Sequence, residues 1–258
     1  MPEITEYAPG TPCWVDVTSP ELDRTISFYS ELFGWEADKV PQPDAGGYTM
    51  FSKDGKHVAA ASPPPQEGMS SFWTTYIASD DVDATAGKVR EAGGSLLMEP
   101  FDVFDSGRMV VAQDPTGAAF GVWQAGEHHG AQLANEPGTV TWNECQTNDV
   151  EAAETFYRAV FGYEIDQMPM GEGEPYRVLK LGDKGVGGMF QITPELGEMP
   201  PNWATVFAVA DTDATCAKAE ELGAKVLVPP IDLPEVGRYA VLQDPVDAVF
   251  QVLANPAD

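Results

Sequence analysis

One stretch of sequence decides the fold: DVDATAGKVREAGGSLLMEPFDVFDSGRMVVAQDPTGAAFGVW at 81–123, which returns without a gap as DTDATCAKAEELGAKVLVPPIDLPEVGRYAVLQDPVDAVFQVL at 211–253. The two copies are identical at 19 of 43 positions, at an offset of 130 residues. A second repeated segment, FYSELFG at 28–34 and FYRAVFG at 156–162, has an offset of 128. Landmarks that recur in one order at a nearly constant offset indicate duplication of a whole domain.

The copies are divided by AGEHHGAQLANEP at 125–137, which has no hydrophobic periodicity and is rich in small and polar residues. We therefore predict a first domain at 1–126, a linker at 127–136 and a second domain at 137–258.

Local signals predict the elements of the first half-domain. A short apolar strand at 13–17 precedes a Ser-Pro pair at 19–20, which is typical of a helix start because serine caps and proline fits the first turn. Apolar residues then recur along one helical stripe within 22–33, and Gly34 ends the helix. The strands that follow turn at the Asp-Gly pair 54–55, a hairpin dipeptide.

The same cycle restarts after the three prolines at 63–65. A strand at 72–78 leads into a helix at 81–92, and three more strands fit between 95 and 124. The order strand, helix and three strands therefore occurs twice in each copy and four times in the chain. Grouped strands flanked by helices predict an α+β fold of four βαβββ modules, in two tandem cup-shaped domains.

The composition narrows the classes of partner. Forty-one acidic residues against 14 basic ones give a formal charge of −27, which disfavours binding to nucleic acid or to an anionic membrane surface. The three cysteines show no CxxC spacing, and the N-terminus lacks the apolar segment of a signal peptide. No stretch has the length and hydrophobicity of a membrane span. We expect a cytoplasmic protein, monomeric or homodimeric, whose partner is a small molecule.

The repeated landmarks carry a family resemblance over 11–124 and 139–254. The matching residues in the first copy are Glu21-Leu22, Phe28-Tyr29, Phe33-Gly34, Asp81-Val82-Asp83-Ala84 and Asp114-Pro115-Thr116-Gly117. Their counterparts are Asp149-Val150, Phe156-Tyr157, Phe161-Gly162, Asp211-Thr212-Asp213-Ala214 and Asp244-Pro245-Val246-Asp247. In these motifs the chain resembles the vicinal oxygen chelate superfamily of glyoxalase I, bleomycin-resistance proteins and extradiol dioxygenases, and most of all its two-domain actinobacterial glyoxalase-like members.

The resemblance implies where a metal would be held, because metal-dependent members place His, Glu or Gln at fixed strand positions. Counting from the landmarks puts these positions at Trp14, Thr74 and Gly121 in the first copy. The counterparts in the second copy are Trp142, Ala204 and Gln251. Of these side chains only that of Gln251 is a plausible ligand for a divalent ion. We therefore expect no metal and no cofactor.

The histidines agree with this expectation. His57 lies near a hairpin, and His128 and His129 lie in the predicted linker. No domain can bring two histidines and a carboxylate into one sheet, which excludes a facial two-His-one-carboxylate iron site within a domain. We interpret His128 and His129 as a solvated linker pair, with adventitious metal binding as the alternative.

The first strands supply the candidate site. Alternation places Trp14 and Asp16 on one face, and likewise Trp142 and Glu144. The resemblance implies that this face lines the cavity of each cup, although ordinary core packing of both tryptophans remains open. For Trp73 and Trp203 packing against the helices is the favoured interpretation.

Two corresponding arginines follow a glycine at a strand entry. Arg108 and Arg238 either bind a ligand or form an ion pair within the fold, with Asp102 and Asp232 as partners. The candidate ligand-binding residues are therefore Trp14, Asp16, Arg108, Trp142, Glu144, Arg238 and Gln251.

Three functions fit these features. The first is metal-free binding or sequestration of an aromatic or cationic metabolite or antibiotic, as the resemblance to bleomycin-resistance proteins implies. The alternative is an enzyme of detoxification or secondary metabolism, a glyoxalase-like lyase, isomerase or hydroxylase-like protein, with Asp16 or Glu144 as the catalytic carboxylate. A structural or interaction role is the third.

Overall fold

The computed structural model describes residues 3–169, 173–194 and 199–256. The four predicted modules are all present, and their order is strand, helix and three strands. The first comprises β1 (Pro12–Thr18), α1 (Leu22–Phe33), β2 (Glu36–Lys39), β3 (Thr49–Lys53) and β4 (Lys56–Ser62), with a short 3-10 helix at Pro43–Ala45. The second comprises β5 (Phe72–Ala78), α2 (Val82–Glu91), β6 (Ser95–Val103), β7 (Gly107–Gln113) and β8 (Ala119–Ala125). The third comprises β9 (Val140–Thr147), α3 (Val150–Phe161), β10 (Glu164–Met168), β11 (Tyr176–Leu181) and β12 (Lys184–Gln191). The fourth comprises β13 (Asn202–Ala208), α4 (Thr212–Glu221), β14 (Lys225–Leu233), β15 (Gly237–Gln243) and β16 (Val249–Ala254).

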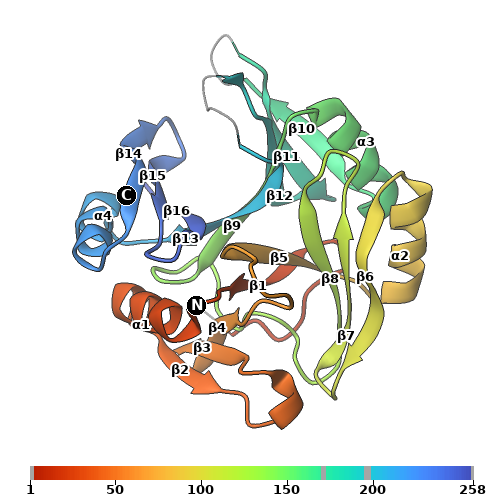
Figure 1. The fold of residues 1–258 in the computed structure, drawn as a ribbon. Helices are drawn as coiled ribbons and strands as arrows, with labels where there is room; N and C mark the ends of the chain where they lie inside the picture. Colours follow the sequence, from red (N-terminus) through yellow and green to blue (C-terminus); the bar gives the residue numbers. More distant parts are fainter. Residues whose placement is uncertain (1–2, 170–172, 195–198, 257–258) are drawn as a thin grey trace.

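The modules form two eight-stranded sheets, one per domain (Figure 1). The first has the order β2-β3-β4-β1-β5-β8-β7-β6, and the second repeats it as β10-β11-β12-β9-β13-β16-β15-β14. Within each sheet the two modules meet along their first strands, β1 with β5 and β9 with β13, which run antiparallel. The predicted α+β fold of two tandem domains is confirmed.

The helix ends follow local chemistry. In α2, α3 and α4 the side chain of an aspartate at the N-cap accepts a hydrogen bond from the backbone three residues on. The first helix differs, because it begins at Leu22 without a side-chain cap. Ser19 instead accepts a hydrogen bond from the backbone N–H of Glu21, so the predicted capping role of the Ser-Pro pair is wrong. Gly34 ends α1 at φ 72°, a conformation that glycine adopts without strain.

The helix-bearing faces of the two sheets are packed against each other. Helix α1 lies beside α4, α2 lies beside α3, and the strands β5 and β13 meet between them (Figure 1). One core cluster joins residues of the first and fourth modules, and another joins residues of the second and third. Each sheet therefore keeps one face outside the domain interface, which we call its inner face. None of the helices within the described residues is long and apolar enough to cross a membrane.

Candidate functional site

The strand register places the predicted first-strand residues on the two inner faces. Trp14 is paired with Tyr76 and Asp16 with Thr74, and across the next strand Tyr76 is paired with Gly121. Paired residues of neighbouring strands share a face of a sheet. The second domain repeats this arrangement, with Val206 paired with both Trp142 and Gln251, and Glu144 paired with Ala204.

A chain of hydrogen bonds crosses the first inner face. The indole Nε1 of Trp14 donates to the hydroxyl of Tyr48 at 3.0 Å. Tyr48 donates in turn to Oδ2 of Asp16 at 3.2 Å, and Tyr76 donates to the same oxygen at 3.0 Å. The carboxylate of Asp16 is therefore the acceptor on which two phenols converge.

The environment of Asp16 changes its acidity. Burial raises the pKa of this carboxyl to about 6, and the hydrogen bonds from Tyr76, Tyr48 and Thr74 oppose the rise without cancelling it. A carboxyl with this pKa exchanges its proton close to neutral pH, as a general acid or base requires.

The first inner face is filled by side chains. Trp14 is 5% exposed and Asp16 is 4% exposed. His128 packs against Trp14, its ring edge-on to the indole with centroids 4.5 Å apart, and Trp123 Nε1 donates to the backbone oxygen of His128 at 2.8 Å. Little of this carboxylate is open to a ligand.

The prediction of a solvated histidine pair is therefore wrong for His128, whereas His129 is exposed. The reason is that the linker does not run free in solvent. Ala131 N–H donates to the oxygen of Cys13 at 2.8 Å, and Gln132 N–H donates to that of His57 at 2.8 Å. These bonds hold the linker along β1 and β4, and burial lowers the pKa of His128 to about 4.

The second inner face repeats the hydrogen-bonded chain but is more open. Trp142 Nε1 donates to the hydroxyl of Tyr176 at 2.8 Å, and Tyr176 is hydrogen-bonded to Glu144. Gln146 Nε2 donates to the same carboxylate at 3.1 Å. Burial raises the pKa of Glu144, yet Trp142, Glu144 and Tyr176 are all half-buried rather than closed off.

The two inner faces also differ at two corresponding positions. Where the first domain has Tyr76 the second has Val206, and where it has Gly121 the second has Gln251. A Cβ atom at Gly121 would lie 2.2 Å from the Tyr76 ring, so the glycine makes room for that ring. In the second domain Gln251 is 2% exposed and its Oε1 has no hydrogen-bond partner among the described residues.

Comparison with known proteins agrees with this duplicated architecture. Residues 13–122 match the Glyoxalase/Bleomycin resistance protein/Dioxygenase superfamily, and residues 141–253 match the glyoxalase-like domain. The chain belongs to this superfamily. It is 48% identical over 257 residues to the protein named "Putative glyoxylase CFP32" of Mycobacterium tuberculosis (strain CDC 1551 / Oshkosh), covering 98% of each chain.

A further relative and a solved structure are similar to the chain over most of its length. It is 43% identical to the anthracycline biosynthesis protein DnrV of Streptomyces peucetius, covering 97% of this chain and 95% of that one. The Mn(II)-bound glyoxalase of Novosphingobium aromaticivorans shares the fold at a TM-score of 0.68 and 15% identity, covering 95% of this chain and 82% of that one.

The residues present do not fit a metal such as the Mn(II) that this glyoxalase binds. Trp14 and Gly121 offer no ligand atom, and the space above Gly121 is taken by the ring of Tyr76. In the second copy the corresponding positions offer only the amide of Gln251. Across 3–169, 173–194 and 199–256 no three His, Cys, Asp or Glu side chains are grouped closely enough to hold an ion.

The other tryptophan pair lies on the helix side of its sheets, as favoured from sequence. Trp73 Nε1 donates to Tyr29 of α1 at 2.9 Å, and Trp203 Nε1 donates to Tyr157 of α3 at 2.7 Å. Both indoles are therefore part of the core of this glyoxalase-type fold.

The structure does not bring Arg108 and Arg238 to the inner faces. Arg108 pairs with Asp83 at 2.8 Å and with Asp102 at 2.9 Å. Arg238 forms the corresponding pairs with Asp213 and Asp232. The ion pairs of the alternative interpretation are the ones observed, and they tie the N-terminal turns of α2 and α4 to the sheets.

Sequence reasoning missed the tyrosines that join indole to carboxylate. Tyr48 and Tyr176 are related by the offset of 128 that also relates the two Phe-Tyr segments. This correspondence could have identified both tyrosines from the sequence. Tyr76 could not be identified in the same way, because Val206 replaces it in the second copy.

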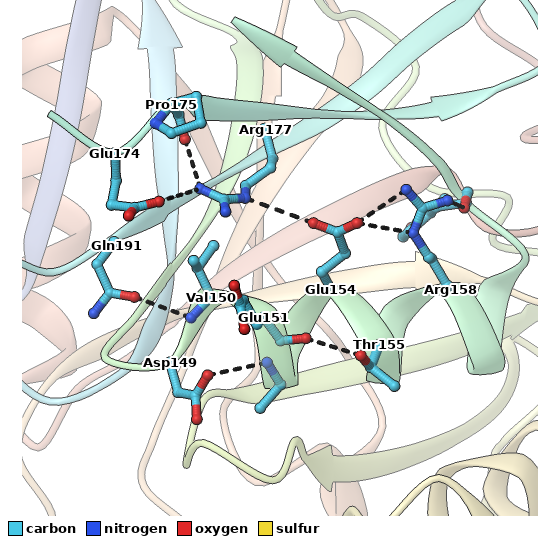
Figure 2. Close-up of polar contacts among 12 residues, drawn as sticks. Asp149, Val150, Glu151, Glu154, Thr155, Arg158, Glu174, Pro175, Arg177 and Gln191 are labelled. Carbon is cyan, nitrogen blue, oxygen red and sulfur yellow. Dashed lines mark hydrogen bonds and ion pairs between the residues drawn. The ribbon is translucent and has the colours of Figure 1, made fainter. Parts of the chain in front are cut away.

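A second polar cluster lies beside α3 (Figure 2), around a cavity of about 280 Å³. Arg177 is buried there, with Nη1 donating to the oxygen of Pro175 at 2.7 Å and Nε 3.6 Å from Glu154. Glu154 also pairs with Arg158 at 2.9 Å, and Glu174 lies 3.4 Å from Arg177. Because Glu154 is paired with both Arg158 and Arg177, this cluster is an ion-pair network that joins α3 to β11.

Proposed function

We propose that this protein binds an aromatic or cationic small molecule on the inner face of its second domain, without a metal. The observation that carries the proposal is the half-buried series Trp142, Tyr176 and Glu144, in which an indole, a phenol and a carboxylate are joined by hydrogen bonds and remain open to solvent. An aromatic surface beside a few convergent polar groups is the usual form of a small-molecule site.

The chemistry of the series favours a ligand with two features. A planar ring stacked on Trp142 gains about 0.5–1.5 kcal/mol beyond its buried area. An ammonium group or another hydrogen-bond donor would pair with the carboxylate of Glu144, and the formal charge of −27 attracts cations to the surface. The name of the relative DnrV supports the aromatic part of this proposal, since anthracyclines are planar polycyclic molecules.

A titration of tryptophan fluorescence tests the proposal with two probes, an anthracycline carrying an amino sugar and its neutral aglycone. Glu144→Gln should weaken binding of the amino-sugar probe about tenfold, an order of magnitude typical of a lost cation interaction. It should leave binding of the aglycone nearly unchanged. Asp16→Asn in the closed first domain is the matched control, and it should affect neither probe. Equal effects of the two substitutions would contradict the assignment of the site.

Catalysis is the second candidate function, and the observation that favours it is that burial raises the pKa of the carboxyl on each inner face, to about 6 for Asp16. A carboxyl poised near neutral pH can act as a general base in a lyase or isomerase reaction. Burial also raises the pKa of Glu144, which lies at the more accessible face. If the site is catalytic, Glu144→Gln should abolish turnover of a bound probe while the neutral probe still binds. If the wild type binds the probe without converting it, and Glu144→Gln only weakens that binding, the site binds its ligand without catalysis.

A further inference from the structure

A cavity of about 390 Å³ lies between the two domains, bordered by residues of both, among them the tryptophans of the two hydrogen-bonded series, Trp14 and Trp142. It is bounded by the first halves of β1 and β9, the beginning of β12, the N-terminal segment and the linker. Its volume is within the range of small-molecule sites, which often occur at domain interfaces.

The walls of the cavity are fixed by hydrogen bonds. Tyr7 donates through its hydroxyl to the oxygen of Ala131 at 2.7 Å, and Ile4 N–H donates to the oxygen of Gln132 at 2.9 Å. The N-terminal segment is thereby held against the linker, and the linker is held against β1 through Cys13. Both segments lie outside the duplicated modules, so the cavity is a feature that duplication alone did not create.

Apolar side chains predominate in the lining of the cavity, and Asn143 is the buried member of its uncharged polar side chains, which also include Thr11, Asn135 and Thr141. Val15, Val140 and Val186 contribute apolar surface, and Trp14 and Trp142 both border the space. The charged lining residues, Glu6 and Lys184, are exposed. Charge is therefore confined to the exposed part of the lining, and an uncharged ligand suits the interior because burying an unpaired ion is costly.

The buried polar side chain is Asn143, which is 6% exposed. Its Oδ1 accepts a hydrogen bond from the hydroxyl of Thr75 in the other domain at 2.9 Å. That bond fixes the orientation of the amide and leaves its Nδ2, which has no hydrogen-bond partner among the described residues, as a donor for a ligand. The counterpart of Asn143 in the first copy is Val15, so the cavity has this amide on one side only.

We propose that the interdomain cavity binds a neutral aromatic molecule that carries a carbonyl group. The rings fill the apolar space, and the carbonyl oxygen accepts a hydrogen bond from Asn143 Nδ2. This site does not rest on the proposed function at Glu144: Trp142 borders both sites, but the polar contact here is the amide of Asn143 and not the carboxylate of Glu144.

The test compares 9-fluorenone with fluorene, which has the same rings but no carbonyl, by titration calorimetry on the full chain. Wild-type protein should bind fluorenone several-fold more tightly than fluorene. Ala134→Trp, which fills the cavity from the linker, should weaken fluorenone binding at least tenfold. His129→Trp adds the same side chain at an exposed linker position outside the cavity and should leave binding unchanged.

A second variant tests the carbonyl contact. Asn143→Asp keeps an acceptor for Thr75 but removes the amide donor, so it should reduce fluorenone affinity to that of fluorene or below. Glu144→Gln should change neither affinity, which separates this site from the second inner face. The proposal is overturned if the wild type does not bind fluorenone, or if Ala134→Trp binds it as the wild type does. Equal affinities of fluorenone and fluorene for the wild type overturn the carbonyl contact.

Discussion

Tyr29 on α1 donates a hydrogen bond to Asp244 of the other domain at 3.0 Å. The symmetric bond joins Tyr157 on α3 to Asp114, also at 3.0 Å. In both cases the tyrosine belongs to the repeated Phe-Tyr segment and the aspartate opens the repeated Asp-Pro turn. The motifs that make the duplication visible in sequence are thus the ones that join the two domains.

Removing one of these hydroxyls should destabilise the whole protein. In Tyr29→Phe both Trp73 Nε1 and Asp244 Oδ2 lose a buried partner, so we expect a loss of about 2–4 kcal/mol in the free energy of unfolding. Urea denaturation followed by circular dichroism measures it. Tyr239→Phe is the control and should cost much less, because Tyr239 lies near Glu144 in the second domain and takes no part in this interdomain bond. Similar losses for both variants would show that the interdomain bond contributes little.

Asp16 should make stability fall as the pH rises. Its folded-state pKa, about 6, lies above the ordinary value of 3.8, so the folded protein retains a proton that the unfolded chain has released. Stability from this group is therefore complete below about pH 4 and is lost between about pH 4 and 6. The shift corresponds to at most about 3 kcal/mol. Asp16→Asn should raise the melting temperature relative to wild type more at pH 8 than at pH 5, and the reverse order would contradict this account.

His128 should have the opposite pH dependence. Burial lowers its folded-state pKa to about 4, below the ordinary 6.5, so the unfolded chain takes up a proton first as the pH falls. This group therefore destabilises the fold progressively from about pH 6.5 down to 4. His128→Leu should raise the melting temperature relative to wild type more at pH 5 than at pH 7.5. An identical difference at the two pH values would mean that the ring is not buried against Trp14 in solution.

The duplicated arginines should matter little for binding. Arg108 and Arg238 are engaged by surface aspartates and lie away from the inner faces, and ion pairs between exposed side chains contribute little to stability. Arg108→Ala and Arg238→Ala should each lower the melting temperature only slightly. Neither should change the affinity for the anthracycline probes. A large loss of affinity in Arg238→Ala alone would show that Arg238 contacts the ligand, as the sequence allowed.

The fold could be predicted because duplication is recorded directly in the residues. The offset of 130 aligned two half-domains without a gap, and the Asp-Gly pair at 54–55 marked a hairpin that the structure contains between β3 and β4. Alternation along a strand was sufficient to place Trp14 with Asp16, since successive side chains point to opposite faces.

The contacts of the site were less predictable because they depend on segments with no periodic signal. Tyr48 precedes β3, and only its distance of 128 residues from Tyr176 marks it. The burial of His128 depends on backbone hydrogen bonds between the linker and β1, which involve no particular side chain. The shared border of Trp14 and Trp142 on one cavity depends on how the domains pack, and no local pattern encodes that packing.

Because the ring of Tyr76 lies above Gly121, the substitutions that would give the first domain a metal ligand at position 121 can occur in one order only. A histidine or glutamate at 121 would place its Cβ 2.2 Å from that ring, so Tyr76 must be replaced before a ligand can be gained. That first step removes a hydrogen bond from Asp16 and supplies no ligand in exchange. The second domain, with Val206 and Gln251 at these places, does not face this barrier. A single substitution at position 251 can therefore change the ligand atoms of the second domain, whereas the corresponding change at position 121 of the first domain needs Tyr76 to be replaced beforehand.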